Sequence, residues 1–250
     1  MVRLDTQGGI AIITIDRAEK ANALPEAGKR KLADAIVAAG QGPDVTALVL
    51  TGAGDRCFCA GSDIAEMQTF GPEGMYRMLG AERDMYLAAL SSPKPVIAAV
   101  NGFALGAGFI LVMACDYAVA AATARFGTPE LTIGVAAPLE GFLLPLIVGL
   151  GHARRLFYTG QQLDAAEAQR LGLIHEVTEP ERCRQRAVEV ARELASLPGT
   201  SFRVQKALLR QLVSTGHLES VIEASRYATS FQFADRAATD ALRRSLSRRQ

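Results

Sequence analysis

The chain of 250 residues contains no tryptophan, three histidines and four cysteines. Four cysteines in a chain of this length do not form a disulfide framework. Cys57 and Cys59 have no nearby histidine and no second cysteine pair to complete a metal shell. The N-terminus, Met-Val-Arg-Leu-Asp, lacks the apolar core of a signal peptide. The sequence therefore predicts no metal site and a cytoplasmic protein with reduced thiols.

An excess of charge of either sign is also missing, since 27 Lys and Arg residues balance 26 Asp and Glu residues. Phosphate backbones are bound by surplus basic residues, so a nucleic-acid partner is not expected. The one local excess is a group of arginines in the last twenty residues, which we interpret as a solvated helix face. With 49% apolar residues, the chain is predicted to be folded around a sizeable core.

Only one uncharged stretch is long enough to raise the question of a membrane span: 21 residues separate Lys94 from Asp116. A proline opens this stretch, an Asn-Gly pair interrupts it at 101–102, and two further glycines break it again. These breaks predict a buried strand, a turn and a helix, and no membrane association.

Hydrophobic periodicity predicts strands that alternate with helices, followed by a helical region. We expect a hairpin around Gly8-Gly9 in residues 4–16 and strands at 45–51, 96–100 and 117–121. Helices are predicted from Pro25 and at 75–90, 106–114, 143–148, 154–158, 165–170, 181–197, 201–212 and 217–233, with another near the C-terminus. Apolar strands separated by helices indicate parallel pairing. Pro198-Gly199 is the predicted boundary between a core of residues 1–197 and a helical region of residues 198–250.

Three segments carry residues suited to chemistry. In Ala60-Gly61-Ser62-Asp63, a glycine allows a close turn, and the Ser-Asp pair is typical of a helix start with outward-facing amides. Residues 101–109 place small residues between a buried strand and an apolar helix. The third segment contains the isolated acids Glu130 and Glu140 in apolar surroundings, which are candidates for proton transfer, with an ordinary ion pair or cap as the alternative.

These three segments, in this order and spacing, resemble the crotonase superfamily, also called the enoyl-CoA hydratase/isomerase family. Residues 16–24 (DRAEKANAL) are similar to the family's CoA-contacting turn, and residues 159–174 to its later signature. The similarity covers residues 2 to about 197 well and the C-terminal helices loosely. It implies an α/β fold, a crotonase-like spiral of β-β-α units, whose helical C-terminal region caps the pocket and builds homotrimers or dimers of trimers.

The resemblance implies an enzyme that binds an acyl-CoA thioester and needs no cofactor beyond the coenzyme A of its substrate. Two backbone amides, at Ser62 and Ala107, would hold the thioester oxygen while an enolate forms. Such donors contribute roughly 3–4 kcal/mol each to the transition state. The residues expected around coenzyme A are Lys20, Ala21, Ala60, Ser62, Asp63 and Ile64.

The acidic residues separate the possible activities. Hydratases of the family use two glutamates, and Glu130 matches the second. The first would lie one helical turn after residue 107, facing the same substrate, where this sequence has Ile110. Glu140 is expected to serve as the second acid of an enoyl-CoA hydratase. The alternatives are a Δ3–Δ2 enoyl-CoA isomerase that uses Glu130 alone, and a CoA-thioester-binding protein without activity.

Overall fold

The computed structural model describes residues 1–136 and 140–213, together with Glu223, Arg226, Ser230, Asp240 and Arg244. The side chains of residues 140–142 and 211–213 lie outside this description. Most of the predicted helix at 217–233, the further C-terminal helix and most of the C-terminal arginines also lie outside the described residues. The proposed division between 197 and 198 therefore stays a prediction.

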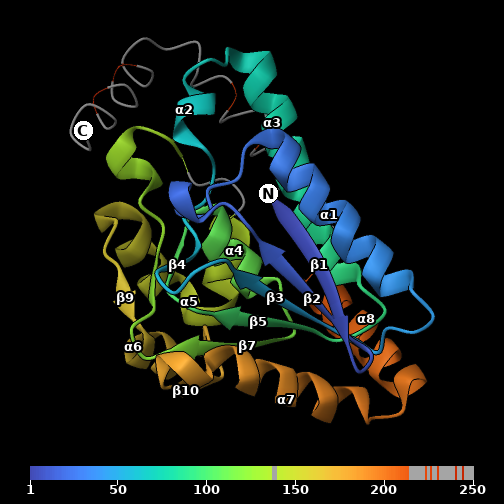
Figure 1. Ribbon diagram of the computed structural model, residues 1–250. Helices are drawn as coiled ribbons and strands as arrows, with labels where there is room; N and C mark the ends of the chain where they lie inside the picture. Colours follow the sequence, from blue (N-terminus) through green and yellow to red (C-terminus); the bar gives the residue numbers. More distant parts are fainter. Residues whose placement is uncertain are drawn as a thin grey trace.

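A six-stranded sheet forms the centre of the molecule, with the strand order β1-β2-β3-β5-β7-β10 (Figure 1). Its first pair is antiparallel and all the other pairs are parallel. The strands are β1 (Val2–Gln7), β2 (Ile10–Ile15), β3 (Ala47–Gly52), β5 (Val96–Val100), β7 (Tyr117–Ala121) and β10 (Glu176–Thr178). The predicted strands at 96–100 and 117–121 are confirmed at these bounds.

The predicted hairpin joins β1 and β2. Gly8 and Gly9 both have positive φ, at 57° and 79°. Two consecutive residues of this kind form the turn whose twist matches that of the two strands, and glycine adopts it without a steric cost. The hairpin places β2 next to β3, where the parallel part of the sheet begins.

The central strands are buried on both faces, which explains their unbroken apolar sequences. In β3, Leu48 and Leu50 face the main hydrophobic cluster, whereas Ala47 and Val49 face a second cluster formed with α7. The same alternation holds in β2, β5 and β7. Because neighbouring side chains point to opposite faces of a strand, one sheet separates two cores.

A second, four-stranded sheet was not predicted. Its order is β4-β6-β8-β9, with β4 (Cys57–Cys59), β6 (Phe103–Leu105), β8 (Arg125–Gly127) and β9 (Leu163–Asp164). Each of β3, β5 and β7 in the large sheet is followed directly by β4, β6 or β8 in the small sheet, and then by helix. This is the expected repetition of β-β-α units, and it makes β4, β6 and β8 parallel neighbours.

Helices cover both faces of the large sheet. The helices are α1 (Glu26–Gln41), α2 (Ile64–Met67), α3 (Pro72–Ser91), α4 (Ala107–Met113), α5 (Glu140–Thr159), α6 (Ala165–Arg170), α7 (Cys183–Ala195) and α8 (Gly199–Val213), with short 3-10 turns η1 (Ala18–Lys20), η2 (Glu130–Ile133) and η3 (Pro180–Arg182). In Figure 1, α1 and α3 lie side by side, and α7 runs along the opposite face against β3, β5 and β7.

The two helices predicted at 143–148 and 154–158 are the two parts of α5, which a kink separates. The kink in α5 lies at Gly149, which has φ 75° and ψ 158°. A left-handed φ with extended ψ cannot continue a helix, and a glycine accepts it most readily.

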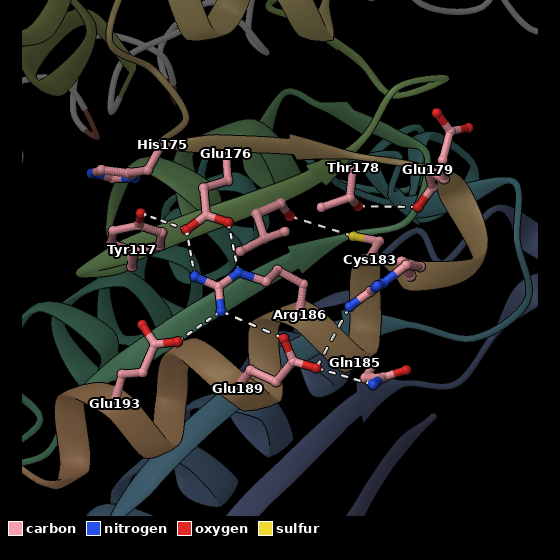
Figure 2. A network of polar contacts seen from close by, with 12 residues as sticks. Tyr117, His175, Glu176, Thr178, Glu179, Cys183, Gln185, Arg186, Glu189 and Glu193 are labelled. Carbon is pink, nitrogen blue, oxygen red and sulfur yellow. Dashed lines mark hydrogen bonds and ion pairs between the residues drawn. The ribbon is translucent and has the colours of Figure 1, made fainter.

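Figure 2 shows the polar contacts that fasten α7 to the ends of β7 and β10. Arg186 of α7 donates to both carboxylate oxygens of Glu176, at 2.7 and 3.0 Å, and to Glu193 at 2.7 Å. Tyr117 donates to Glu176 at 2.9 Å, and its ring stacks on His175 at 4.2 Å between centroids. The hydrogen bond from Arg186, with support from Tyr117, holds the pKa of Glu176 below its usual value against the opposing effect of burial.

Within the described ranges, none of the helices is long and apolar enough to cross a membrane. The uncharged stretch after Lys94 forms β5, β6 and α4, as its internal breaks predicted.

Candidate active site

The candidate site lies where β4, β6 and β8 end. These three strands are adjacent in the small sheet, and each is followed at once by one of the segments singled out in the sequence. Residues 60–62 follow β4, Gly106 and Ala107 follow β6, and Glu130 begins η2 shortly after β8. The carboxyl ends of parallel strands meet at one edge of a sheet, so segments about 45 and 23 residues apart in sequence reach the same cavity.

The turn after β4 directs one backbone amide away from its neighbours. Leu24 donates its N–H to Gly61 at 2.8 Å and accepts from the N–H of Asp63 at 3.0 Å. In this parallel bridge the residue between those two partners, Ser62, has its own N–H on the side opposite Leu24. Among the backbone hydrogen bonds of the described residues, the Ser62 amide is not a donor.

A second amide becomes available at the start of α4. Ala107 is the first residue of that helix, so its N–H has no acceptor within the helix. Gly106 before it has φ 51° and ψ −125°, a conformation open essentially to glycine. The two turns are in close contact, because a Cβ added to Gly61 would lie 3.3 Å from the Ala107 nitrogen.

Glu130 is held against this second turn. A Cβ added to Gly106 would overlap the Oε1 atom of Glu130, which places the carboxylate directly beside the residue that precedes the Ala107 amide. The Oε2 atom of Glu130 is buried. The structure thus brings together Ser62, Ala107 and Glu130, three of the four residues predicted for catalysis.

A cavity that is open to solvent joins these groups. Its walls beyond the turns are mostly apolar and include a hydrophobic cluster of Met67, Met75, Leu79 and Val135. Met75 of α3 belongs to both the buried cluster and the cavity wall. The cavity has the mixture typical of small-molecule sites, an apolar lining with a few placed polar groups.

Two charged residues at this cavity were missed by the sequence reasoning. Glu82 of α3 lines the cavity, and Lys29 of α1 lies behind it with none of its surface exposed. Lys29 pairs with the Oε2 atom of Glu82 and donates to the Ser62 hydroxyl at 2.6 Å. Ser62 in turn donates to the same Glu82 oxygen at 2.9 Å. Both charges fall inside ordinary helix patterns 53 residues apart, so sequence periodicity carried no signal of the pair.

A second cavity begins where the first ends. It shares Ala60 and Leu105 with the first and is also lined by Ala21, Glu19 and Arg56. The predicted coenzyme A contacts at Ala21 and Ala60 therefore lie together, joined by a hydrogen bond of 3.1 Å from the Ala60 amide to the Ala21 carbonyl. Lys20 is exposed at the end of η1 and is not part of the wall of either cavity.

The turn that carries Ala21 is shaped by a buried asparagine. Asn22 is fully buried and donates to the Cys57 carbonyl at 2.6 Å and to the Ala53 carbonyl at 3.0 Å, while its Oδ1 accepts from the Arg17 amide. Ala21 and Asn22 both have positive φ, at 50° and 55°. Side-chain bonds of this kind compensate for a backbone conformation that most residues avoid.

Among the other residues predicted to contact coenzyme A, Ile64 lines the first cavity. The side chain of Asp63 instead makes structural hydrogen bonds. Its carboxylate caps α2 through the amides of Ala65 and Glu66 and accepts from Arg17 at 2.6 Å. Burial would raise the pKa of Asp63, but these hydrogen bonds lower it on balance.

Ile110, at the position expected for the first glutamate, is fully buried in the main hydrophobic cluster, and α4 contacts both α3 and α5. Glu140 is the first residue of α5, and its side chain lies outside the described residues. Its part as a second acid stays a prediction.

The cysteines have no direct part in this chemistry. All four are free, and burial raises the pKa of the Cys57 and Cys59 thiols to about 12. Thiols in that state are poor nucleophiles and poor metal ligands at neutral pH. Within the part of the chain that the structure describes, no group of three or more potential ligands could hold a metal ion.

Comparison with known proteins identifies the family of the chain. A family model for enoyl-CoA hydratase/isomerase matches residues 5–248. The crotonyl-CoA hydratase of Syntrophomonas wolfei is 35% identical over 234 residues, which span 93% of this chain and 90% of that protein. The short-chain-enoyl-CoA hydratase of Clostridium acetobutylicum is 37% identical over 213 residues, 84% of this chain and 81% of its own.

Among solved structures, an enoyl-CoA hydratase from Bacillus anthracis is similar with a TM-score of 0.81 at 30% identity, covering 91% of this chain and 90% of that one. The chain belongs to the enoyl-CoA hydratase/isomerase family: it has the crotonase fold and is an enzyme of the hydratase-like, acyl-CoA-dependent type.

Proposed function

We propose that this protein catalyses the reversible addition of water to a 2-enoyl-CoA thioester. The observation that carries the proposal is the contact of Glu130 with Gly106, which sets a carboxylate next to the Ala107 amide in the cavity that also contains Ser62. A thioester oxygen held by the two amides would place the α-carbon of the acyl group within reach of Glu130. The hydratase names of the relatives in Syntrophomonas and Clostridium support the same reaction class.

Binding of the substrate would use both cavities. The acyl group would occupy the cavity with the apolar wall of Met67, Met75 and Leu79, and the coenzyme A portion would lie in the adjoining one beside Ala21 and Ala60. Lys20 and Arg56 at or near that second cavity are the cations available to the phosphates of coenzyme A.

In the proposed reaction, the oxygen of water bonds to the β-carbon while Glu130 takes one of its protons. The electron pair of the double bond moves toward the thioester carbonyl, and the amides of Ser62 and Ala107 stabilise the enolate oxygen that forms. Glu130 then returns the proton to the α-carbon. The carboxylate ends the cycle as it began it, so the sum of the steps is the addition of water.

Isomerisation is the second candidate function, and the apolar residue at position 110 favours it. Ile110 is buried and offers no group to bind water. Glu130 alone suffices to move a proton from the α-carbon of a 3-enoyl thioester to its γ-carbon, which needs no water.

The proposal includes a homo-oligomer, a trimer or a dimer of trimers. Its support is the apolar outer face of α8, where Val204, Leu208 and Leu209 are each more than half exposed. Light scattering after size-exclusion chromatography should give three or six times the mass of one chain. The buried or partly buried free thiols suit a cytoplasmic location.

The choice of reaction can be tested with purified protein and two substrates. Crotonyl-CoA should lose its conjugated-enone absorbance under a hydratase, whereas a 3-enoyl-CoA should gain that absorbance under an isomerase. Glu140→Gln, assayed beside the wild type, decides whether that carboxylate takes part. A protein that binds butyryl-CoA but changes neither substrate would contradict both activities.

A further inference from the structure

One carboxylate in the cavity has no part in the reaction described so far. Glu82 lies on the stripe of α3 formed by residues 75, 79 and 82, which successive turns of a helix bring to one face. The first two positions are Met75 and Leu79, so Glu82 is the charged member of an otherwise apolar wall. Its residue exposure is 4%, and it is one of the residues that line the cavity.

The contacts of Glu82 fix which of its two oxygens faces the cavity. Lys29 Nζ is a donor only, so it gives one hydrogen to Glu82 Oε2 and another to the Ser62 oxygen. The Ser62 hydroxyl then donates its own hydrogen to Glu82 Oε2. Among the described residues, all hydrogen bonds to Glu82 end on Oε2. The other oxygen, Oε1, is therefore left to accept from whatever occupies the cavity.

Stability does not account for this arrangement. A buried ion pair contributes little to folding on balance, and apolar side chains of similar size often replace one without loss. The neighbours on α3 would suit such a replacement, because Met78 contacts Lys29 and Leu79 lines the same cavity as Glu82. A charged acceptor kept here by a fully buried lysine indicates a function in the cavity.

We propose that Glu82 Oε1 holds the water molecule that adds to the β-carbon of the substrate. This proposal rests on the hydratase function given above. Water would donate one hydrogen to Glu82 and give the other, as a proton, to Glu130 while its oxygen bonds to carbon. Glu82 keeps its own protonation state throughout, so the balance of the reaction is unchanged. Lys29 and the Ser62 hydroxyl are positioning groups that fix the direction of Oε1.

The substitution Glu82→Gln tests this assignment with nearly the same shape. Because Lys29 can only donate, the amide oxygen of the glutamine must face Lys29, and its NH₂ group must face the cavity. The variant therefore presents a donor where the wild type presents an acceptor. Hydration of crotonyl-CoA should fall by about tenfold to 10²-fold. The exposed Glu73→Gln on the same helix is the matched control and should hydrate at the wild-type rate.

A second measurement separates the water-binding step from enolate formation. Butyryl-CoA in D₂O exchanges its α-protons through Glu130 and the two amides alone, which mass spectrometry follows. Glu82→Gln should retain this exchange within about threefold, whereas Glu130→Gln should lose both reactions. Removal of one charge leaves the other buried without its partner and lowers stability. Thermal melting is therefore recorded for each variant. The double variant Lys29→Met/Glu82→Leu removes both charges and should show the same loss of hydration with retained exchange.

Three outcomes would overturn the proposal. If Glu82→Gln and the double variant both hydrate crotonyl-CoA at the wild-type rate, Glu82 takes no part in the reaction. Loss of hydration and exchange together, at an unchanged melting temperature, would mean that Glu82 acts on the enolate site through Ser62 and not on water. A wild-type protein that exchanges α-protons but hydrates no enoyl thioester would disprove the proposed function, and the part of Glu82 in it.

Discussion

Among the ion pairs of the described residues, two networks have opposite character. At the cavity, Lys29 and Glu82 have side-chain exposures of 0% and 5%. On the far face of the large sheet, Arg186 and Glu193 have exposures of 25% and 61%, in the group drawn in Figure 2. Water screens the second network, and its loss would cost little, whereas the first is sealed from water except at the cavity. Of these two networks, the one at the cavity should therefore be the more sensitive to loss of a single charge.

The largest expected difference between the two networks follows from removing one cation of each. Lys29→Met leaves Glu82 buried without its partner and should lower the free energy of unfolding by about 3–5 kcal/mol. The double variant Lys29→Met/Glu82→Leu should recover most of that loss, because no charge is left unpaired. Urea unfolding of both proteins measures the two values. A decrease in the free energy of unfolding of less than about 1 kcal/mol in Lys29→Met would contradict the burial of this ion pair away from water.

The cavity side should also be sensitive to a single methyl group. In Gly106→Ala the added Cβ overlaps Glu130 Oε1, so the carboxylate must move and hydration should fall by about 10²-fold or more. Gly172→Ala is the control, since Gly172 has φ 78° and open space where its Cβ would lie. Both variants should lose roughly 1–2 kcal/mol of stability from backbone strain. Equal activities of the two variants would contradict the contact between Gly106 and Glu130.

On the side of α7, Arg186→Met should have a small effect. The partly exposed bonds to Glu176 and Glu193 contribute about 1 kcal/mol at most, and the site is on the other face of the sheet. Thermal melting should show a modest decrease, and hydration of crotonyl-CoA should stay at the wild-type rate. A change in activity beyond twofold would show that the two networks are coupled.

The smallest expected effect is a change in stability with pH. The pKa of Glu176 is lowered in the folded protein, so its ionised form stabilises the fold at neutral pH. That contribution is present above the unfolded pKa, roughly 4.3, and is lost as the pH falls through the lower folded value. The difference in melting temperature between wild type and Glu176→Gln should therefore be present at pH 7 and shrink below about pH 4. A difference in melting temperature that grows as the pH falls would contradict the predicted direction of the pKa shift.

The inner strands of the large sheet could be predicted from sequence because they are apolar on both faces, as at 96–100 and 117–121, whereas the three-residue strand β10 was not predicted. The small sheet could not, because three-residue strands such as Cys57–Cys59 carry no periodicity. The family resemblance identified the backbone groups at Ser62 and Ala107, and the structure brings them into one cavity.

The remaining features of the site depend on tertiary contacts. Lys29 and Glu82 each fit a plain amphipathic helix, and only the packing of α1 on α3 joins them. Helical spacing places residue 110 one turn after Ala107, but its burial in the main cluster comes from the packing of α4 against other elements. Side-chain direction at a helix start depends on what packs around it, which a single sequence does not state.

In the proposed reaction, Glu130 is the group that transfers the proton, beside two main-chain donors. The measurement that tests it most directly is the exchange of butyryl-CoA α-protons in D₂O by wild type and by Glu130→Gln. We predict measurable exchange in the wild type and a decrease of about 10²-fold or more in the variant, with butyryl-CoA still bound. Exchange at the wild-type rate in Glu130→Gln would contradict the account.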